Sequence, residues 1–214
     1  MTQRPILYSF RRCPYAMRAR LALAVAGQTV ELREIVLRDK VQEFVAAFPN
    51  ATVPGLILPD GSTHAESLDI MHWALDQHDP DGWRDAPVDE TAALIAEADT
   101  SFKTALDHYK YASRHPEIDA MAERDTGLAF LSRLDAQLQG QDHLFGAAPR
   151  LADFAILPFV RQFAYVDIDW FTAQPIPNVI AWLDRFLASP AFAAIMSKYA
   201  RWTAGDAPVL FPDP

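Results

Sequence analysis

The junction between a predicted strand and a predicted helix, within residues 6–25, constrains the fold more than any other feature of the sequence. Residues 6–8 are a short apolar run that predicts a strand, and apolar residues recur at helical spacing from Met17 to Val25. Pro14 suits the first position of a helix, which places Cys13 at the N-cap. A thiol there faces unpaired backbone N–H groups and the positive end of the helix dipole. We therefore expect Cys13 to be a nucleophilic thiolate near neutral pH.

Two interpretations of Cys13 are open. A lone cysteine is often a small buried core residue. Here Arg11 and Arg12 precede it and a proline follows it, which is untypical of a core strand and adds positive charge that favours the thiolate. Cys13 is also the only cysteine in 214 residues, so it cannot form an intramolecular disulfide. Any redox chemistry must use one protein thiol and an external thiol that resolves the mixed disulfide.

The charge distribution indicates a small anionic ligand. The net charge is −9, which argues against a general nucleic-acid binder. Residues 1–40 nevertheless carry eight basic side chains against three acidic ones, so the region around the thiol is basic. The sequence shows no signal-like N-terminus, no apolar stretch long enough to span a membrane and no disulfide framework. We expect a cytoplasmic protein that does not associate with membranes.

Hydrophobic periodicity predicts two domains, one α/β and one all-α. Residues 1–78 have the expected order β-α-β-α-β-β-α, and residues 79–87 form a polar, proline-rich linker. Residues 88–214 predict an all-helical domain, and the proline-rich tail at its end cannot continue a helix. The expected helices of this domain are 88–113, 117–139, 152–166, 177–188 and 191–202.

Three short motifs, in the right order on these elements, give the chain a family resemblance. They are the Cys-Pro-Tyr-Ala run at 13–16, the pair Val53-Pro54 and the pair Glu66-Ser67, which opens the third helix. Together with the helical second part, they resemble the cytosolic glutathione transferase superfamily over essentially the whole chain. The cysteine resembles that of the omega-like and glutaredoxin-like members. The resemblance implies a thioredoxin-like first domain, glutathione as co-substrate, no metal, and a homodimer.

The resemblance also implies a glutathione site. Pro54 matches a cis proline, so that the backbone of Val53 would pair with the cysteinyl part of glutathione. Glu66 would bind the ammonium of the γ-glutamyl end, and Ser67 with the helix N-terminus would bind its carboxylate. Taken singly, Val53-Pro54 could simply end a strand and Glu66-Ser67 could simply cap a helix.

Two further residues of the expected glutathione site come from the same resemblance. Lys40 matches a lysine of the omega-type members and would pair with the glycyl carboxylate. Tyr15 lies where an aromatic residue follows the Cys-Pro and would form part of the pocket wall.

The second substrate of this superfamily lies against the first long helix of the helical domain. Tyr109, Lys110 and Arg114 on that helix, and Trp202 near the C-terminus, are therefore candidate contacts for an electrophile or disulfide. The alternative is that the aromatic residues belong to the core and the cations are solvated. The six histidines have no spacing that would bind a metal together with Cys13.

Two positions depart from the family pattern. The family has glycine near Ala51, so the chain before the proline is expected to be tighter here. Arg150 occupies the place of a Ser or Thr N-cap before Leu151-Ala152-Asp153, so half of a capping box is missing. Arg150 could instead form an ion pair with an acidic side chain.

The function implied is glutathione-dependent thiol transfer or reduction through Cys13, such as deglutathionylation, dehydroascorbate reduction or reduction of glutathionyl adducts. A hydroxyl of Tyr8 or Ser9 could instead stabilise a glutathione thiolate, which would favour a conjugating transferase. A non-enzymatic protein-interaction module with the same fold is the third possibility. Such modules typically lack the nucleophile or the γ-glutamyl pair, and this sequence has both.

Overall fold

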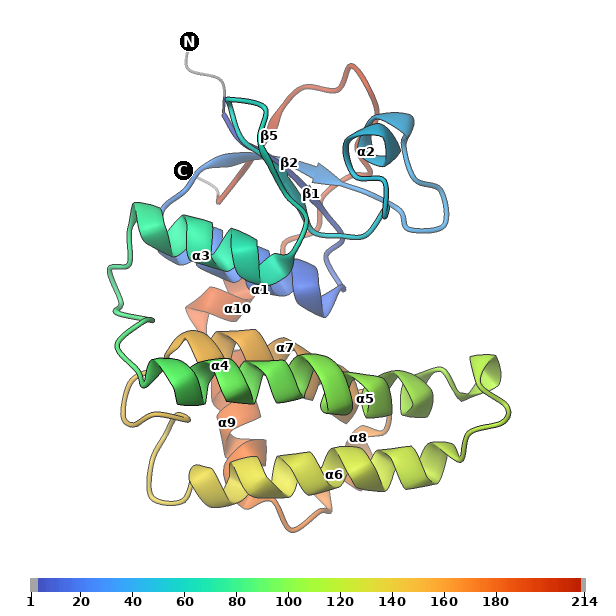
Figure 1. The fold of residues 1–214 in the computed structure, drawn as a ribbon, viewed down its shortest axis with the longest axis vertical. Coiled ribbons are helices and arrows are strands. Elements are labelled where there is room, and N and C mark those ends of the chain that lie inside the picture. The colour runs from blue at the N-terminus through green and yellow to red at the C-terminus, as the bar shows by residue number, and fades with distance from the viewer. Residues whose placement is uncertain (1–3, 213–214) are drawn as a thin grey trace. The chain divides into compact units, whose positions relative to one another are not determined.

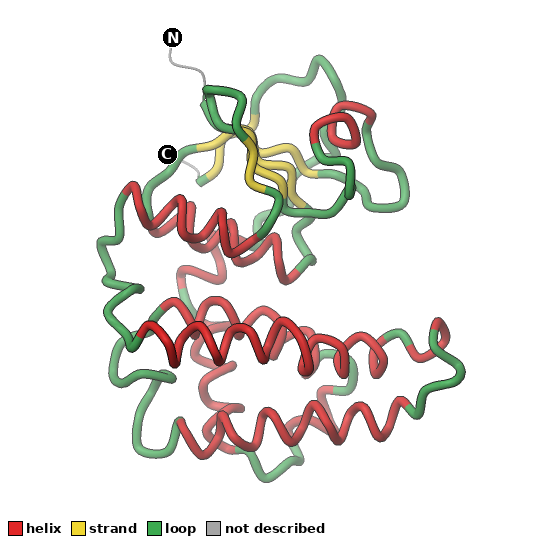
Figure 2. Tube along the Cα trace, in the orientation of Figure 1, coloured by secondary structure: helices red, strands yellow, loops and turns green. Residues whose placement is uncertain are grey.

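The computed structural model describes residues 4–212, which form two compact units. The first unit contains residues up to 81 and, in addition, residues from 189 onward. Its five-stranded sheet has the order β4-β3-β1-β2-β5 (Figures 1 and 2). The strands are β1 (Ile6–Ser9), β2 (Val30–Glu34), β3 (Gly55–Ile57), β4 (Thr63–His64) and β5 (Val209–Phe211). β1 and β2 are parallel, and the other pairs are antiparallel.

The helices of the first unit are α1 (Pro14–Val25), α2 (Gln42–Ala47), α3 (Ser67–Gln77) and the short α10 (Pro190–Ile195). The predicted β-α-β-α-β-β-α order is confirmed, and with it the thioredoxin-like fold. α1 and α3 lie side by side on one face of the sheet (Figure 1). Successive strand residues point to opposite faces, and Leu7 and Tyr8 of β1 are both buried, so each face of the sheet has its own core.

An aromatic cluster fills the core of the first unit beside α2. The Tyr8 ring lies 5.1 Å from that of Phe44 and 6.0 Å from that of Trp202, between centroids. Phe48 and Val53 belong to the same cluster. The segment before β3 therefore packs against the aromatic rings.

The last segment of the chain differs from the prediction that residues 88–214 form one helical domain. Residues from 189 onward pack on the first unit, the helix expected at 191–202 ends at Ile195, and β5 pairs with β2. Arg20 of α1 donates to the Ile195 carbonyl at 3.0 Å, and the backbone N–H of Trp202 donates to the Glu34 carbonyl at 2.8 Å. These long-range bonds hold the chain in an extended path after α10.

The second unit, residues 82–188, consists of helices joined by loops. Its helices are α4 (Val88–Glu97), α5 (Lys103–Lys110), α6 (Ala120–Gln137), α7 (Leu151–Ala164), α8 (Ile168–Thr172) and α9 (Pro177–Ala188). A π-helical turn, Ala98–Phe102, joins α4 to α5, so the predicted helix at 88–113 is one nearly continuous run that ends in a 3-10 turn, Ala112–Arg114. In residues 4–212, no helix is long and apolar enough to cross a membrane.

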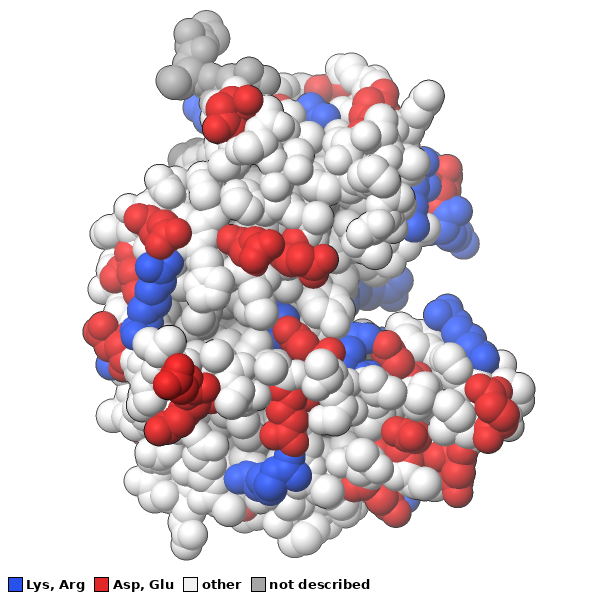
Figure 3. Space-filling view, viewed as in Figure 1, with Lys and Arg blue, Asp and Glu red and all other residues white. Residues whose placement is uncertain are grey.

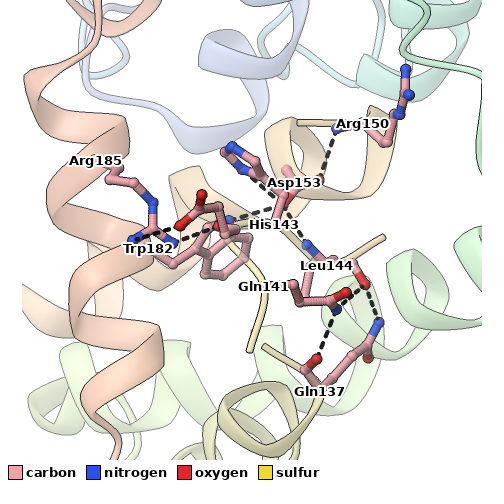
Figure 4. Close-up of polar contacts among 9 residues, drawn as sticks. Gln137, Gln141, His143, Leu144, Arg150, Asp153, Trp182 and Arg185 are labelled. Carbon is pink, nitrogen blue, oxygen red and sulfur yellow. Dashed lines mark hydrogen bonds and ion pairs between the residues drawn. The ribbon is translucent and has the colours of Figure 1, made fainter. Parts of the chain in front are cut away.

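Asp153 organises the start of α7, the most buried helix of the second unit. Its carboxylate is fully buried and accepts three hydrogen bonds, from the backbone N–H of Arg150 (2.8 Å), the backbone N–H of Leu144 (3.0 Å) and Trp182 Nε1 (2.9 Å) (Figure 4). His143 Nδ1 lies 3.7 Å from the same carboxylate. One side chain thus joins the preceding loop, α7 and α9.

Arg150 supplies no acceptor to the first turn of α7, as the sequence predicts. Its guanidinium instead donates to the Gly82 carbonyl, and it lies 3.7 Å from the exposed carboxylate of Asp85. The backbone N–H of Leu151 donates to the Trp83 carbonyl at 2.8 Å. The start of α7 is therefore bound to the segment that leads into α4. Arg150 pairs with an acidic side chain, which is the alternative that the sequence left open for it.

Candidate active site

Cys13 is the N-cap of α1, with Pro14 at the first helical position. Its backbone is extended (φ −76°, ψ 125°), and its N–H donates to the Phe10 carbonyl at 2.9 Å. The side chain is partly exposed and packs at the edge of the aromatic cluster. Cys13 Sγ lies 3.7 Å from the carbonyl oxygen of Val53. The thiol, the helix N-terminus and the residue before Pro54 therefore meet at one place.

The segment 51–55 is shaped by its neighbours. The peptide bond between Val53 and Pro54 is cis, as the resemblance implies. Ala51 has φ +49°, in the left-handed region that glycine adopts without cost, so the backbone is strained at this position. A Cβ on Gly55 would lie 2.6 Å from the Phe48 ring, so only glycine leaves room for the aromatic cluster.

Ser67 lies at the start of α3, and its side chain is buried. Glu66, the N-cap of α3, is exposed. Arg18 of α1 is fully buried and donates from Nη1 to Ser67 Oγ at 3.4 Å. The N-termini of two adjacent helices thus carry Cys13 and Ser67, with a buried cation beside Ser67.

Arg18 did not figure in the site expected from the sequence. The signal that could have found it is its spacing: it lies four residues after Pro14, on the same face of a helix whose residues are mostly apolar. A cation on the buried face of such a helix needs a polar neighbour. Ser67 is one such neighbour here.

Tyr8 and Ser9 are both buried, the latter completely. The Tyr8 hydroxyl accepts a hydrogen bond from Arg33 Nη1 at 2.7 Å. Of the three residues considered near the end of β1, the two hydroxyl residues are therefore buried and Cys13 has a partly exposed side chain.

The two arginines before Cys13 contact groups other than the thiol. Arg11 Nη1 donates to the Met196 carbonyl at 3.2 Å, and the Arg12 guanidinium lies 5.3 Å from the centroid of the Phe10 ring. Tyr15 is partly buried, with the Arg18 guanidinium 5.6 Å from its ring centroid. The sulfur lies at the N-terminus of α1 and contacts the Val53 carbonyl oxygen.

A buried ion pair lies behind this loop. Arg20 donates to Glu34, which also accepts the backbone N–H of Arg11 at 2.6 Å. Burial raises the pKa of the Glu34 carboxyl, against the opposing effect of Arg20. The same desolvation lowers the pKa of Arg20. The pair ties the Cys13 loop to the end of β2.

The remaining predicted residues lie in different surroundings. Lys40 is exposed, in the loop between β2 and α2. Trp202 is buried in the aromatic cluster of the first unit, with the Arg33 guanidinium 4.2 Å from its ring centroid. In residues 4–212, no group of three His, Cys, Asp or Glu side chains is arranged to hold a metal ion.

Three predicted contacts of the second substrate belong to the helical unit. Tyr109 is 7% exposed and packs against Phe163, and burial raises the pKa of its hydroxyl. The cationic groups of Lys110 and Arg114 lie 5.1 Å and 4.4 Å from the centroid of the Tyr111 ring. Lys110 and Arg114 thus share one aromatic partner, whereas Tyr109 is a core residue.

Comparison with known proteins places the chain in a family. A family model described as the N-terminal domain of glutathione S-transferase matches residues 7–82, and one described as its C-terminal domain matches residues 92–185. The chain therefore belongs to the glutathione S-transferase superfamily. A search of curated proteins found no match.

Several solved structures share the fold. One is a glutathione transferase family member from Pseudomonas fluorescens Pf-5 with two glutathione molecules bound (20% identity, TM-score 0.77, 92% of this chain and 93% of that chain). Others are glutathione transferase Omega 3C from Trametes versicolor (18%, 0.75, 94% and 92%) and URE2P6 from Phanerochaete chrysosporium in complex with oxidised glutathione (20%, 0.76, 90% and 94%). At these identities, the likeness is one of fold.

Proposed function

We propose that this protein catalyses glutathione-dependent thiol–disulfide exchange through Cys13. The observation that carries the proposal is the position of Cys13 Sγ, at a helix N-terminus and 3.7 Å from the Val53 carbonyl oxygen. A glutathione whose cysteinyl backbone pairs with Val53 would bring its own sulfur into reach of Cys13. The helix N-terminus favours the thiolate, which is the form that attacks disulfides.

The residues at the start of α3 would bind the other end of glutathione. Ser67 and the first N–H groups of α3 suit the γ-glutamyl carboxylate, and the buried cation of Arg18 adds positive charge beside them. Glu66, exposed at the same helix start, suits the γ-glutamyl ammonium. Lys40 would pair with the glycyl carboxylate from its exposed loop, and Tyr15 would form part of the wall.

The reaction then has two exchange steps. The Cys13 thiolate attacks the glutathionyl sulfur of a mixed disulfide, a Cys13–glutathione disulfide forms, and the other thiol leaves as a thiolate that takes a proton from water. A second glutathione thiolate attacks the glutathionyl sulfur on Cys13, oxidised glutathione leaves, and the Cys13 thiolate is restored. No second protein thiol is needed, in keeping with the single cysteine.

Mass spectrometry of the intact protein tests the first step. After exposure to oxidised glutathione, the wild type should gain one glutathionyl group, which glutathione removes, and Cys13→Ser should gain none. Cys13→Ser should also lose disulfide exchange but keep its fold, checked by circular dichroism. A Ser variant that reduced mixed disulfides at the wild-type rate would disprove the monothiol mechanism, and activity limited to conjugation would favour the alternative transferase.

Glutathione affinity tests the binding site separately. Ser67→Ala removes a hydrogen bond to a charged carboxylate, which is worth roughly 1.5–3 kcal/mol or about 10- to 150-fold in the dissociation constant. Ser62→Ala, on an exposed turn, is the matched control. An unchanged affinity for Ser67→Ala, measured by calorimetry, would place the γ-glutamyl site elsewhere.

We further propose a cytoplasmic homodimer, in which the first unit of one subunit contacts the helical unit of the other. Assembly of this kind follows from the family alone. Sedimentation equilibrium that gave the mass of a monomer, 23.9 kDa, at micromolar concentration would refute it.

A further inference from the structure

A basic groove lies in the first unit, next to the Cys13 loop. It has a volume of about 300 Å³ and is lined by the loop after β1, the end of β2 and the segment after α10. Four of its side chains are cationic, Arg11, Arg12, Lys198 and Arg201, and a single one, Glu34, is acidic. Basic side chains gather at the right-hand edge of this unit in Figure 3.

The positive charge of the groove is not cancelled by its own carboxylates. Glu34 is already engaged by Arg20 and by the Arg11 N–H. Asp39 pairs with Arg201 at 2.6 Å and is 62% exposed, so it offsets one cation only weakly. Arg12 and Lys198 are both exposed. The groove therefore presents a net positive surface to solvent.

The wall formed by residues 196–202 is fixed at both ends. At one end Arg11 Nη1 donates to the Met196 carbonyl, and at the other the Trp202 N–H donates to the Glu34 carbonyl. Arg201 adds a bond to the Asp39 carbonyl at 3.1 Å. A groove whose walls are tied together in this way keeps its shape before a ligand arrives, which lowers the entropic cost of binding.

The groove and the Cys13 side chain share apolar neighbours. Phe10 and Ile35 line the groove and also belong to, or pack against, the aromatic cluster on which Cys13 packs. Val36 and Tyr199 add further apolar surface to the groove. Such a lining suits an organic anion with a short hydrocarbon stem. The anion would lie next to the loop that carries Cys13.

We infer that this groove selects the second substrate: it binds the part of a glutathione mixed disulfide that is not glutathione, when that part carries a negative charge. The inference rests on the proposed function. In the first exchange step, Cys13 attacks the glutathionyl sulfur and the other thiolate leaves from that sulfur, while the cations of the groove hold the negatively charged group of the leaving thiolate. An anionic substrate should therefore react with a higher kcat/KM than a neutral one.

Two mixed disulfides of glutathione test the inference. One carries 3-mercaptopropionate, which is anionic, and the other 2-mercaptoethanol, which is neutral and of similar size. The wild type should show a higher kcat/KM for the anionic disulfide. Lys198→Gln should lower the ratio of the two kcat/KM values about two- to fivefold, the range that exposed ion pairs give, and Arg12→Gln with Lys198→Gln about tenfold. Arg133→Gln, on the surface of the helical unit, is the matched control and should leave the ratio unchanged.

A non-reactive dianion separates this inference from the proposed function. Suberate carries an aliphatic carboxylate like that of the 3-mercaptopropionate group but has no disulfide, and its binding can be followed by ligand-observed NMR. It should bind the wild type, more weakly at high salt, and bind the Arg12→Gln/Lys198→Gln variant at least tenfold more weakly. Turnover of both disulfides with a ratio near one that neither variant changes would overturn the groove and leave the proposed function standing. If neither disulfide reacts, the proposed function fails, and suberate binding alone decides: loss in the double variant supports the groove, and equal binding refutes it.

Discussion

Replacing Asp153 by asparagine should destabilise the helical unit strongly, although the two side chains have nearly the same shape. The carboxylate is fully buried, with Oδ1 accepting from the Leu144 N–H and Trp182 Nε1 and Oδ2 accepting from the Arg150 N–H (Figure 4). An amide has one acceptor oxygen. In its better orientation, the oxygen faces Leu144 and Trp182, and the NH₂ group faces the Arg150 N–H, so a donor meets a donor.

The magnitude follows from these contacts. The lost bond to Arg150 involved a charged acceptor and is worth roughly 1.5–3 kcal/mol. The two remaining bonds change from charged to neutral acceptors, which roughly halves them and costs about 1 kcal/mol each. Relief of the carboxylate's desolvation offsets part of the total. We expect a net loss of about 3 kcal/mol, or a fall of roughly 6–12 °C in the melting temperature for a chain of this size.

Thermal and urea unfolding, followed by tryptophan fluorescence and by circular dichroism, measures this loss. Asp142→Asn is the matched control, because that carboxylate is 68% exposed and lies 3.7 Å from Arg185 in a surface ion pair. It should change stability by less than about 1 kcal/mol. A loss below about 1 kcal/mol for Asp153→Asn would show that the buried carboxylate does not carry the junction of α7, α9 and the preceding loop.

Three further predictions concern stability. Ala51→Gly should raise the free energy of unfolding by about 0.5–1 kcal/mol, because relief of the left-handed backbone exceeds the extra entropy of the unfolded chain; a lower melting temperature would contradict this. Arg150→Ser should lower the urea midpoint by an amount equivalent to about 1 kcal/mol, since the lost bond to Gly82 outweighs the cap that serine gains; an increase would show the cap to be the larger effect. Because burial raises the pKa of Glu34, its contribution to stability is fully present below its unfolded pKa and is lost as the pH rises through the folded value. The stability difference between the non-titrating variant Glu34→Gln and the wild type should therefore shift in favour of the variant as the pH rises above the unfolded value of about 4.3, and urea midpoints that stay parallel would refute this.

The sequence alone determined the parts of the protein whose physical cause is local. The N-cap position of Cys13 follows from the strand, the proline and the helical spacing around it, all within 20 residues. The order of elements in residues 1–78 and the run of helices that follows come from hydrophobic periodicity, which each segment carries by itself. The sequence likewise predicted that position 150 gives α7 no side-chain acceptor, because an arginine side chain has only donors.

The tertiary structure decided what depends on partners distant in the sequence. Residues from 189 onward pack on the first unit because β5 pairs with the edge of β2. In addition, Arg11 and Arg20 donate to the carbonyls of Met196 and Ile195 at the end of α10. Helical periodicity says nothing about which edge is free or which carbonyls need a donor. The basic groove next to Cys13 exists through this packing, since residues from both ends of the chain form its walls. The burial of Arg18 beside Ser67 has the same origin: it requires α1 and α3 to lie side by side.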